Sequence, residues 1–166
     1  MKNLKFLSLL LLTTIVFWSC SDDDDGTIVI EEQPQNIVEL AQSNPNLSSL
    51  VAAVVEANLT VTLSGPGPFT VLAPTDEAFA EFMSDNGWNT VADIPDEALE
   101  QTLLNHVISG TVTSSDLINL QSGYTSTLAS GPANSNISLK FDATNGVMFN
   151  SASEVTIPDV MASNGI

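Results

Sequence analysis

The residues with the clearest capacity for chemistry lie in one short stretch near the amino terminus, C-S-D-D-D-D-G-T-I-V-I-E-E, from Cys20 to Glu32. Counted from Ser21, this stretch nearly matches a calcium-binding loop, in which oxygen ligands recur at fixed positions around a glycine turn. The matching residues are Asp23, Asp25, Gly26, Ile28 and Glu32. However, the first ligand position holds a serine, and a chain that begins at Cys20 has no room for the entering helix. We therefore expect no metal site here.

The second interpretation of the same stretch makes Cys20 the attachment point of a lipid. Two lysines precede an apolar run over residues 6–18, which is too short to span a bilayer comfortably and is typical of a signal peptide. Cys20 is the one cysteine, so an intramolecular disulfide is excluded. The segment Phe17-Trp18-Ser19-Cys20 resembles a bacterial lipobox, whose cysteine is acylated after cleavage. An ordinary signal peptide that leaves a free thiol is the alternative.

The residues that follow Cys20 form an acidic tether. We place the signal peptide at 1–19 and the tether at 20–35, because the acidic run and the residues up to Pro34 lack the pattern of a packed element. The run resembles export signals that send lipoproteins of some Gram-negative groups to the outward face of the outer membrane. The candidate signal residues are Ser21, Asp22, Asp23, Asp24 and Asp25. We expect an outward-facing envelope protein that the lipid anchors to the outer membrane.

The charge of the chain excludes several classes of partner. The formal net charge is −17, and cleavage before Cys20 leaves Lys140 as the one basic side chain. Proteins that bind nucleic acids need clustered lysine and arginine to displace counterions from phosphates. The same charge opposes contact between the folded region and anionic lipid headgroups. We expect no nucleic acid partner, and contact with the membrane only through the lipid.

Catalytic groups are sparse along the chain. His106 is the one histidine and lies on an apolar helical face, so we interpret it as a buried structural residue. Acidic pairs such as Asp76 and Glu77 stand at predicted helix starts, where the helix dipole stabilises negative charge. No second cysteine or histidine can complete a zinc set, and no G-x-S-x-G elbow is present. We expect no enzyme, no metal and no cofactor, with a hydrolase and a calcium-dependent switch as further alternatives.

Helical spacing of apolar residues predicts a helix pair early in the folded region. The segments N-I-V-E-L-A-Q and L-S-S-L-V-A-A-V-V-E-A are separated by the helix-breaking S-N-P-N. A second break, S-G-P-G-P at 64–68, leads into the β-rich run 69–72. The buried face of the pair is expected to include Leu47, Leu50, Val51, Val54 and Val55.

Capping signals predict three further helices. Thr75 is the expected N-cap of the first. Pro95 opens the second, which is expected to end at Ser109-Gly110. Ser114 or Ser115 would cap the third. The inner face of the second helix would consist of Leu99, Leu103, His106 and Val107.

The period changes to two after Tyr124, which predicts strands. Ile137, Leu139 and Phe141 alternate with polar residues, and Asn145-Gly146 is a strong hairpin signal. Val155 and Ile157 are expected to begin a further strand. Helices followed by strands indicate an α+β domain.

Three blocks together resemble the fasciclin-like domain, a family of extracellular adhesion and matrix modules. The blocks are F-T-V-L-A-P-T-D-E-A-F at 69–79, L-L-N-H-V-I-S-G at 103–110, and the N-G hairpin followed by I-P-D-V-M-A-S-N-G-I at 157–166. The resemblance covers about residues 36–166. It implies an α+β wedge of two small β-sheets with several helices along one edge. With the lipobox, it indicates a bacterial lipoprotein of the Bacteroidetes type.

Two departures from the family pattern concern the site and the end of the domain. The second block often carries a tyrosine before its histidine, a pair implicated in receptor contact in some animal members. Here the pair is Asn105 and His106, which are the candidate ligand-contact residues that the resemblance implies. The family pattern also continues into another apolar strand after Ile166. We therefore expect a domain at 36–166 that is incomplete at its carboxyl end and leaves a sheet edge open.

The combined interpretation is a lipid-anchored cell-surface adhesion or binding module. It would recognise an extracellular protein or polysaccharide by surface complementarity, without catalysis. The alternative is a structural envelope spacer or assembly partner that has no adhesive role.

Overall fold

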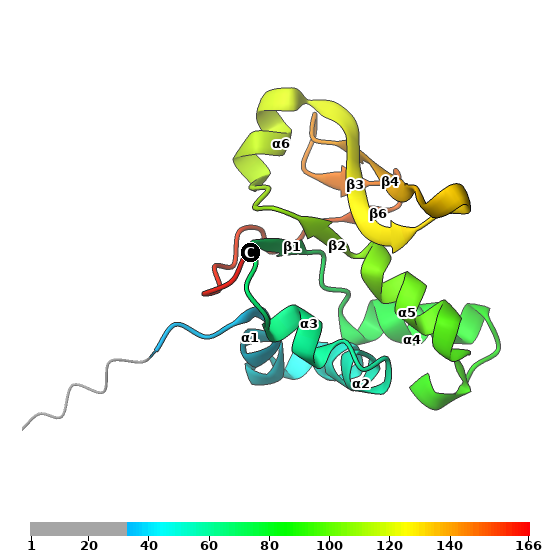
Figure 1. The fold of residues 1–166 in the computed structure, drawn as a ribbon. Coiled ribbons are helices and arrows are strands. Elements are labelled where there is room, and N and C mark those ends of the chain that lie inside the picture. The colour runs from blue at the N-terminus through cyan, green and yellow to red at the C-terminus, as the bar shows by residue number, and fades with distance from the viewer. Residues whose placement is uncertain (1–32) are drawn as a thin grey trace, which may run out of the picture. The chain divides into compact units, whose positions relative to one another are not determined.

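The structure of the protein is a computed structural model that describes residues 33–166. Figure 1 traces its helices and strands in chain order. The helices are α1 (Ile37–Ser43), α2 (Ser48–Glu56), α3 (Thr60–Ser64), α4 (Asp76–Asp85), α5 (Asp96–Asn105) and α6 (Ser114–Leu120). The strands are β1 (Phe69–Val71), β2 (Val107–Ser109), β3 (Ser122–Ser130), β4 (Asn136–Asp142), β5 (Met148–Phe149) and β6 (Ser153–Glu154). Short 3₁₀ turns are η1 (Pro45–Leu47), η2 (Val91–Asp93) and η3 (Pro132–Asn134).

Local side-chain caps explain where several helices begin. Asn36 and Glu39 form a capping box at α1, in which Asn36 Oδ1 accepts from the backbone amide of Glu39 (3.0 Å) and Glu39 Oε2 accepts from that of Asn36 (2.8 Å). Thr75 caps α4, as predicted, because its hydroxyl accepts from the amide of Ala78 (3.4 Å). The cap of α6 is Thr113, one residue before Ser114 and two before Ser115, the two predicted caps.

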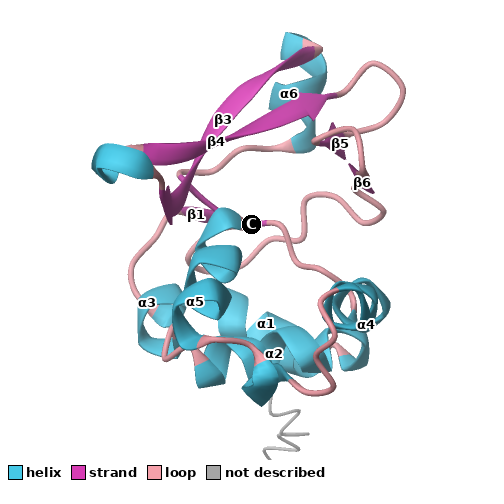
Figure 2. Cartoon of the chain, turned by 90° about the vertical axis from the view of Figure 1, so that its right-hand side faces the viewer, coloured by secondary structure: helices cyan, strands magenta, loops and turns pink. Residues whose placement is uncertain are grey.

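Helices α1 to α5 surround the first of two apolar cores, and Figure 2 shows them gathered on one side of the strands. Leu50 and Val54 of the predicted helix pair are buried in this core, whereas Val55 is 56% exposed and does not belong to the inner face. Burial of this many aliphatic side chains provides the main stabilising term of the helical layer. The core consists of Val38, Leu50, Ala53, Val54, Leu59, Leu63, Phe79, Ile94, Leu99, Leu103 and Val107.

The prediction that one helix continues to Ser109-Gly110 is wrong. Helix α5 ends at Asn105, His106 is its C-cap, and the next three residues form β2. Strand β2 pairs with β1 in antiparallel register, with Thr70 opposite Ile108. Val107 and Ile108, which are β-branched, pair with Val71 and Thr70 of the distant strand β1, and this tertiary pairing overrides the helical spacing that the local sequence shows.

The six strands follow one antiparallel order, β1-β2-β3-β4-β5-β6, which bends into two small portions. Strands β2 and β3 share the single pair Ile108 and Thr127, whereas β3 and β4 pair along most of their length from Ser122 opposite Asp142 to Ser130 opposite Asn136. Strand β3 therefore belongs to both portions. The predicted α+β class is confirmed: the sheet has two small portions, α1 to α5 gather on one side of the strands, and α6 packs at the other end.

The second core lies under β3 to β6 and α6. Leu139 and Phe141 point inward from β4, as the alternation predicts, and the Asn145-Gly146 turn joins β4 to β5. The predicted strand at Val155 and Ile157 is wrong, because β6 ends at Glu154 and Ile157 is 73% exposed. This core comprises Leu117, Leu139, Phe141, Ala143, Val147 and Phe149.

Residues 164–166 lie along the edge of β1 that β2 leaves free. Phe69 donates to the carbonyl of Asn164 (3.1 Å), Ile166 donates to that of Phe69 (2.9 Å), and Val71 donates to that of Ile166 (2.9 Å). Three backbone hydrogen bonds therefore cover this side of β1, while the incompleteness of the domain at its carboxyl end stays a prediction.

Candidate interaction surface

The structure does not reach the predicted lipid-attachment and export residues. Cys20 and the run Ser21, Asp22, Asp23, Asp24 and Asp25 lie outside residues 33–166, which are the residues that the structure describes. The calcium-loop alternative falls in the same part of the chain. All three remain predictions from sequence.

Asn105 lies at the carboxyl end of α5, and its side chain faces β3. Its Oδ1 accepts a hydrogen bond from the hydroxyl of Thr127 (3.2 Å), a residue that is completely buried. One turn earlier, Gln101 Oε1 accepts from the amide of Ser130 (2.9 Å). Residues four apart share a helix face, so these two side chains fasten α5 to β3. The amide oxygen of Asn105 thus has a structural role within the domain.

His106 follows directly at the junction between α5 and β2 and is half-buried. Its Nδ1 lies 2.8 Å from the carbonyl oxygen of Thr102, which fixes the ring over the last turn of α5. The backbone carbonyl of His106 accepts from the amide of Leu72 (2.8 Å). Both side chains of the predicted pair therefore make contacts inside the domain, each with a different partner.

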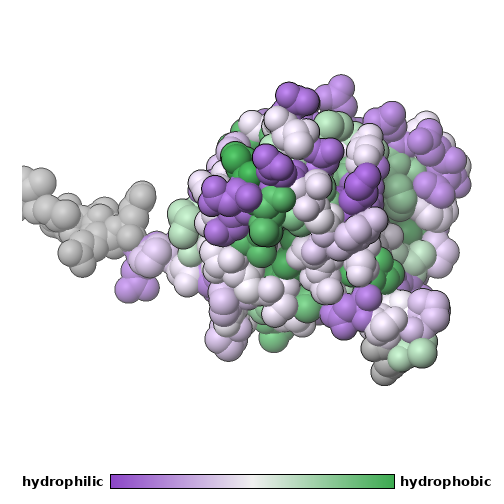
Figure 3. Space-filling view, turned by 90° about the horizontal axis from the view of Figure 1, so that it is seen from above, coloured by the Kyte–Doolittle hydropathy of each residue, from purple (hydrophilic) through white to green (hydrophobic). Residues whose placement is uncertain are grey.

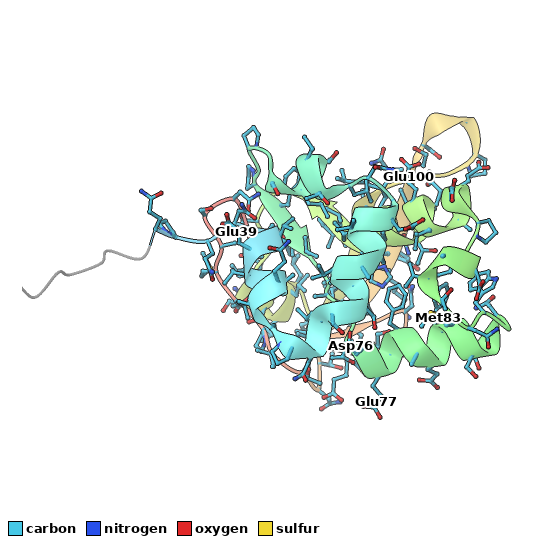
Figure 4. All side chains as sticks on the ribbon, turned by 90° about the horizontal axis from the view of Figure 1, so that it is seen from below. Glu39, Asp76, Glu77, Met83 and Glu100 are labelled. Atoms are coloured by element: carbon cyan, nitrogen blue, oxygen red, sulfur yellow. The ribbon has the colours of Figure 1, made fainter. Side chains whose placement is uncertain are left out.

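Acidic side chains are concentrated in the helical part of the domain. Ten of the fourteen acidic residues within 33–166 precede residue 107, and no lysine or arginine accompanies them there. Figure 4 shows Glu39, Glu77 and Glu100 on this side, with Glu77 directed away from the helices. In the remainder, Asp116, Asp142 and Asp159 accept hydrogen bonds from neighbouring residues. Like charge at this density repels acidic partners.

The exposed apolar side chains are concentrated instead in the second half of the domain. Figure 3 shows green apolar surface between polar residues on the face that carries α6 and the β3-β4 ribbon. We call the side chains of α6 and of the loop after β6 the apolar surface. It consists of Ile118, Leu120, Ile157, Val160 and Met161, each at least half exposed. Apolar side chains that gather on one part of a surface mark an interaction site, whereas scattered single ones are normal.

Asp159 connects the two elements that carry the apolar surface. Its Oδ1 accepts from the backbone amide of Ser114 (2.8 Å) and its Oδ2 accepts from the Ser114 hydroxyl (2.6 Å). The loop is thereby fixed to the first turn of α6. The helix dipole of α6 also stabilises the negative charge of a carboxylate at this amino end.

A shallow groove borders Met161 on the other side of the loop. It is lined by the 66–68 turn, Thr111 and residues 161–165. The turn approaches the loop so closely that a Cβ on Gly67 would collide with the carbonyl oxygen of Asn164. Only glycine fits at this approach.

Sequence reasoning missed the residue that holds this region together, Asn164. Its Oδ1 accepts from the amide of Ile37 (2.9 Å), and its Nδ2 donates to the carbonyls of Leu63 (2.8 Å) and Gly65 (2.9 Å). One side chain thus joins the start of α1, the end of α3 and the last residues of the chain. The N-G-I at the end of the third block was the available signal, but nothing local shows which carbonyls it meets.

Metal binding and membrane crossing have no structural support within residues 33–166. No three His, Cys, Asp or Glu side chains gather there as a metal set would require. Over the same residues, no helix has both the length and the apolar character to cross a membrane.

The chain matches the model of one protein family, described as the Fasciclin domain, over residues 45–166. Two proteins of the bacterium Synechocystis are similar to it. Uncharacterized protein sll1735 is 40% identical over 79% of this chain and 90% of its own length. Protein sll1483 is 36% identical over 81% of this chain and 70% of its own length.

More distant similarities extend to animals. The pig transforming growth factor-beta-induced protein ig-h3 is 34% identical over 48% of this chain, which corresponds to 11% of that protein. A solved pair of FAS1 domains from the insect cell adhesion molecule Fasciclin I superposes with a TM-score of 0.61 at 16% identity. The superposition covers 79% of this chain and 47% of the insect one, so at this identity it shows a shared fold.

Proposed function

This chain belongs to the Fasciclin domain family, and from that premise we propose that it is a lipid-anchored adhesion or binding module at a bacterial cell surface. Domains of this family are generally linked to cell adhesion and are typically not enzymes. The partner is an extracellular protein or polysaccharide that the domain recognises by surface complementarity. The lipid on Cys20 holds the module to the outer membrane of a Bacteroidetes-type cell, and Ser21 to Asp25 direct it outward.

The division of the surface into an acidic and an apolar side is the observation that carries this proposal. The acidic helices repel the anionic polymers of a cell envelope, whereas the apolar surface presents Ile157, Val160 and Met161 around one carboxylate, Asp159, that is bonded to Ser114. Apolar side chains of this kind form the buried centre of protein interfaces. Contact with the partner is therefore made through α6 and the loop after β6.

Anchoring and display are tested on intact cells. Incorporation of labelled palmitate into the full-length protein, compared with the Cys20→Ala variant, is expected to depend on the thiol. Protease added to unbroken cells is expected to digest the protein. A protein that takes up label but is fully protected until lysis contradicts outward display and supports the envelope spacer instead.

The binding surface is tested with a matched pair of variants. Met161→Asp places a charge on the apolar surface, and Val61→Asp places the same charge on a helix at a side chain that is 83% exposed. The measurement is adhesion between cells that display the protein, seen as cell–cell aggregation. Cells that display Met161→Asp are expected to lose this aggregation, while cells that display Val61→Asp retain it. Equal aggregation by both variants and the wild type contradicts the assignment of this surface.

A further inference from the structure

The chain contains three Asn-Gly dipeptides in very different surroundings: Asn86-Gly87, Asn145-Gly146 and Asn164-Gly165. Asparagine followed by glycine is the pair most prone to spontaneous deamidation, because a glycine without Cβ lets the backbone nitrogen approach the preceding side chain. The reaction also needs a side chain that is free to rotate toward that nitrogen. The three sites differ in this second requirement.

Two of the three side chains are held in place. Asn164 is half-buried and makes the three hydrogen bonds described above, from both ends of its amide. Asn86 donates from Nδ2 to the carbonyl of Phe82 (2.8 Å). In addition, the backbone amide of Gly87, which would be the attacking nitrogen, donates to the carbonyl of Ser84 (3.1 Å).

Asn145 differs from both. It is exposed at the tip of the turn between β4 and β5, and its side chain makes no hydrogen bond with any part of the chain that the structure describes. Gly146 beside it has a φ of 98°, a conformation that glycine adopts without steric cost. We propose that Asn145 is a site of spontaneous deamidation in the folded protein, from which the fold protects Asn86 and Asn164.

The reaction consumes one water and releases one ammonia. The Gly146 nitrogen loses its proton to solvent and attacks Asn145 Cγ, so that a carbon-nitrogen bond forms as the Cγ-Nδ2 bond breaks and ammonia leaves. Water then opens the succinimide ring at either carbonyl and yields aspartate or isoaspartate. No electron is transferred, and no co-reactant other than solvent is needed.

The product alters the part of the sheet that the turn connects. Glu154 Oε1 lies 3.6 Å from the position that a Cβ on Gly146 would occupy, so the new carboxylate arises in a turn that an existing carboxylate already borders. The isoaspartate form also adds a backbone atom between β4 and β5, whose register sets Phe141 opposite Phe149. Both effects oppose the pairing of β5 with β4 and β6.

The test begins with incubation of the intact protein in neutral buffer. The protein is then digested with a protease, and mass spectrometry of the peptides measures the conversion of each of the three asparagines. Asn145 is expected to convert on the order of a hundredfold faster than Asn164, since three hydrogen bonds must open at the latter. A parallel sample in denaturant is the control, and there all three sites are expected to convert at similar rates.

Two outcomes overturn the proposal. One is similar conversion at all three sites in the native protein, which means that the fold gives no selectivity. The other is an unchanged Asn145 in native protein while the denatured sample converts it. Asn145→Gln serves as the second variant, because its longer side chain forms the ring far less readily and should remove the native modification without removing an observed contact.

Discussion

The carboxylate of Asp76, in the first turn of α4, accepts a hydrogen bond from the backbone amide of Ser49 at the start of α2 (2.7 Å). It also accepts from the Ser48 hydroxyl (2.6 Å). Helix α2 has no side-chain cap of its own, because Leu47 occupies its N-cap position. Asp76 thus caps a helix that lies twenty-seven residues upstream while it occupies the first turn of another. Figure 4 places it at the junction of the two helices.

Replacement of this cap should weaken the domain. Asp76→Asn removes the charge that both helix ends favour and is expected to lower the urea midpoint of unfolding. Glu77→Gln is the control, since the same charge is removed in the same turn from a side chain that points away from the helices. If the urea midpoint shifts equally in the two variants, the loss of one negative charge explains the shift, and the capping hydrogen bonds of Asp76 do not.

Stability should fall when the solution is acidified below about pH 4. Four carboxylates accept hydrogen bonds that favour their charged form, which holds each pKa below its ordinary value of 3.8. A depressed pKa in the folded state contributes stability that is present above 3.8 and is lost as the pH falls through the folded value. The main donors are the Ser48 hydroxyl for Asp76, the Thr90 amide for Asp93, the Thr113 hydroxyl for Asp116 and the Thr144 amide for Asp142.

The measurement is the urea midpoint as a function of pH. A midpoint that stays constant from neutral pH to 3 contradicts the assignment. In Asp76→Asn the acid-dependent part of the loss is expected to be smaller than in the wild type, because one of the four groups no longer titrates.

Asn164 is expected to be among the most important polar side chains for stability. Asn164→Ala leaves the Ile37 amide and the Leu63 and Gly65 carbonyls without this partner, at a cost of about 1–3 kcal/mol. Asn164→Asp keeps an acceptor for Ile37 but sets a carboxylate against two carbonyls, so it should be no less harmful. Asn46→Ala, at an exposed position, is the control. Chemical unfolding measures the loss in free energy of unfolding for each variant. A loss in Asn164→Ala no larger than that in Asn46→Ala contradicts the stabilising role of Asn164.

Leu99 provides a test of the helical core. It is 1% exposed, and Leu99→Ala is expected to cost about 2–5 kcal/mol through lost burial and the cavity left behind. Val61→Ala, on the exposed side of α3, is expected to change the free energy of unfolding by less than about 0.5 kcal/mol. A loss below about 1 kcal/mol for Leu99→Ala would show that the core closes around the cavity.

The parts of the fold that could be predicted are those with local causes. Thr75 caps α4 through an amide three residues away, and the alternation of Leu139 and Phe141 reports the inner face of β4 directly. The boundary between α5 and β2 was missed because the residues 106–109 fit a helix locally, and only the pairing with β1 selects a strand. The bonds that Asp76 and Asn164 make to other elements were missed for the same reason, since their partners are distant in sequence.

The candidate site was predictable to a lesser degree. The resemblance located Asn105 and His106, but it could not show that the amide of Asn105 meets Thr127 or that Thr102 orients the histidine ring. The apolar surface had no sequence signal, because Ile157 was predicted to lie in a strand, whereas the backbone places it in an exposed loop.

The contacts of residues 33–37 with the last turn of the domain determine how a mechanical load enters it. Ser163 donates to the carbonyl of Gln35 (2.8 Å), and Ile37 donates to Asn164, which in turn lies along β1. Tension applied through the amino end therefore reaches β1 through these bonds before it reaches the cap of α1. Under the proposed anchoring through Cys20, a pull from the cell would load β1 and, through the bonds of Asn164 to Leu63 and Gly65, the end of α3 at the same time.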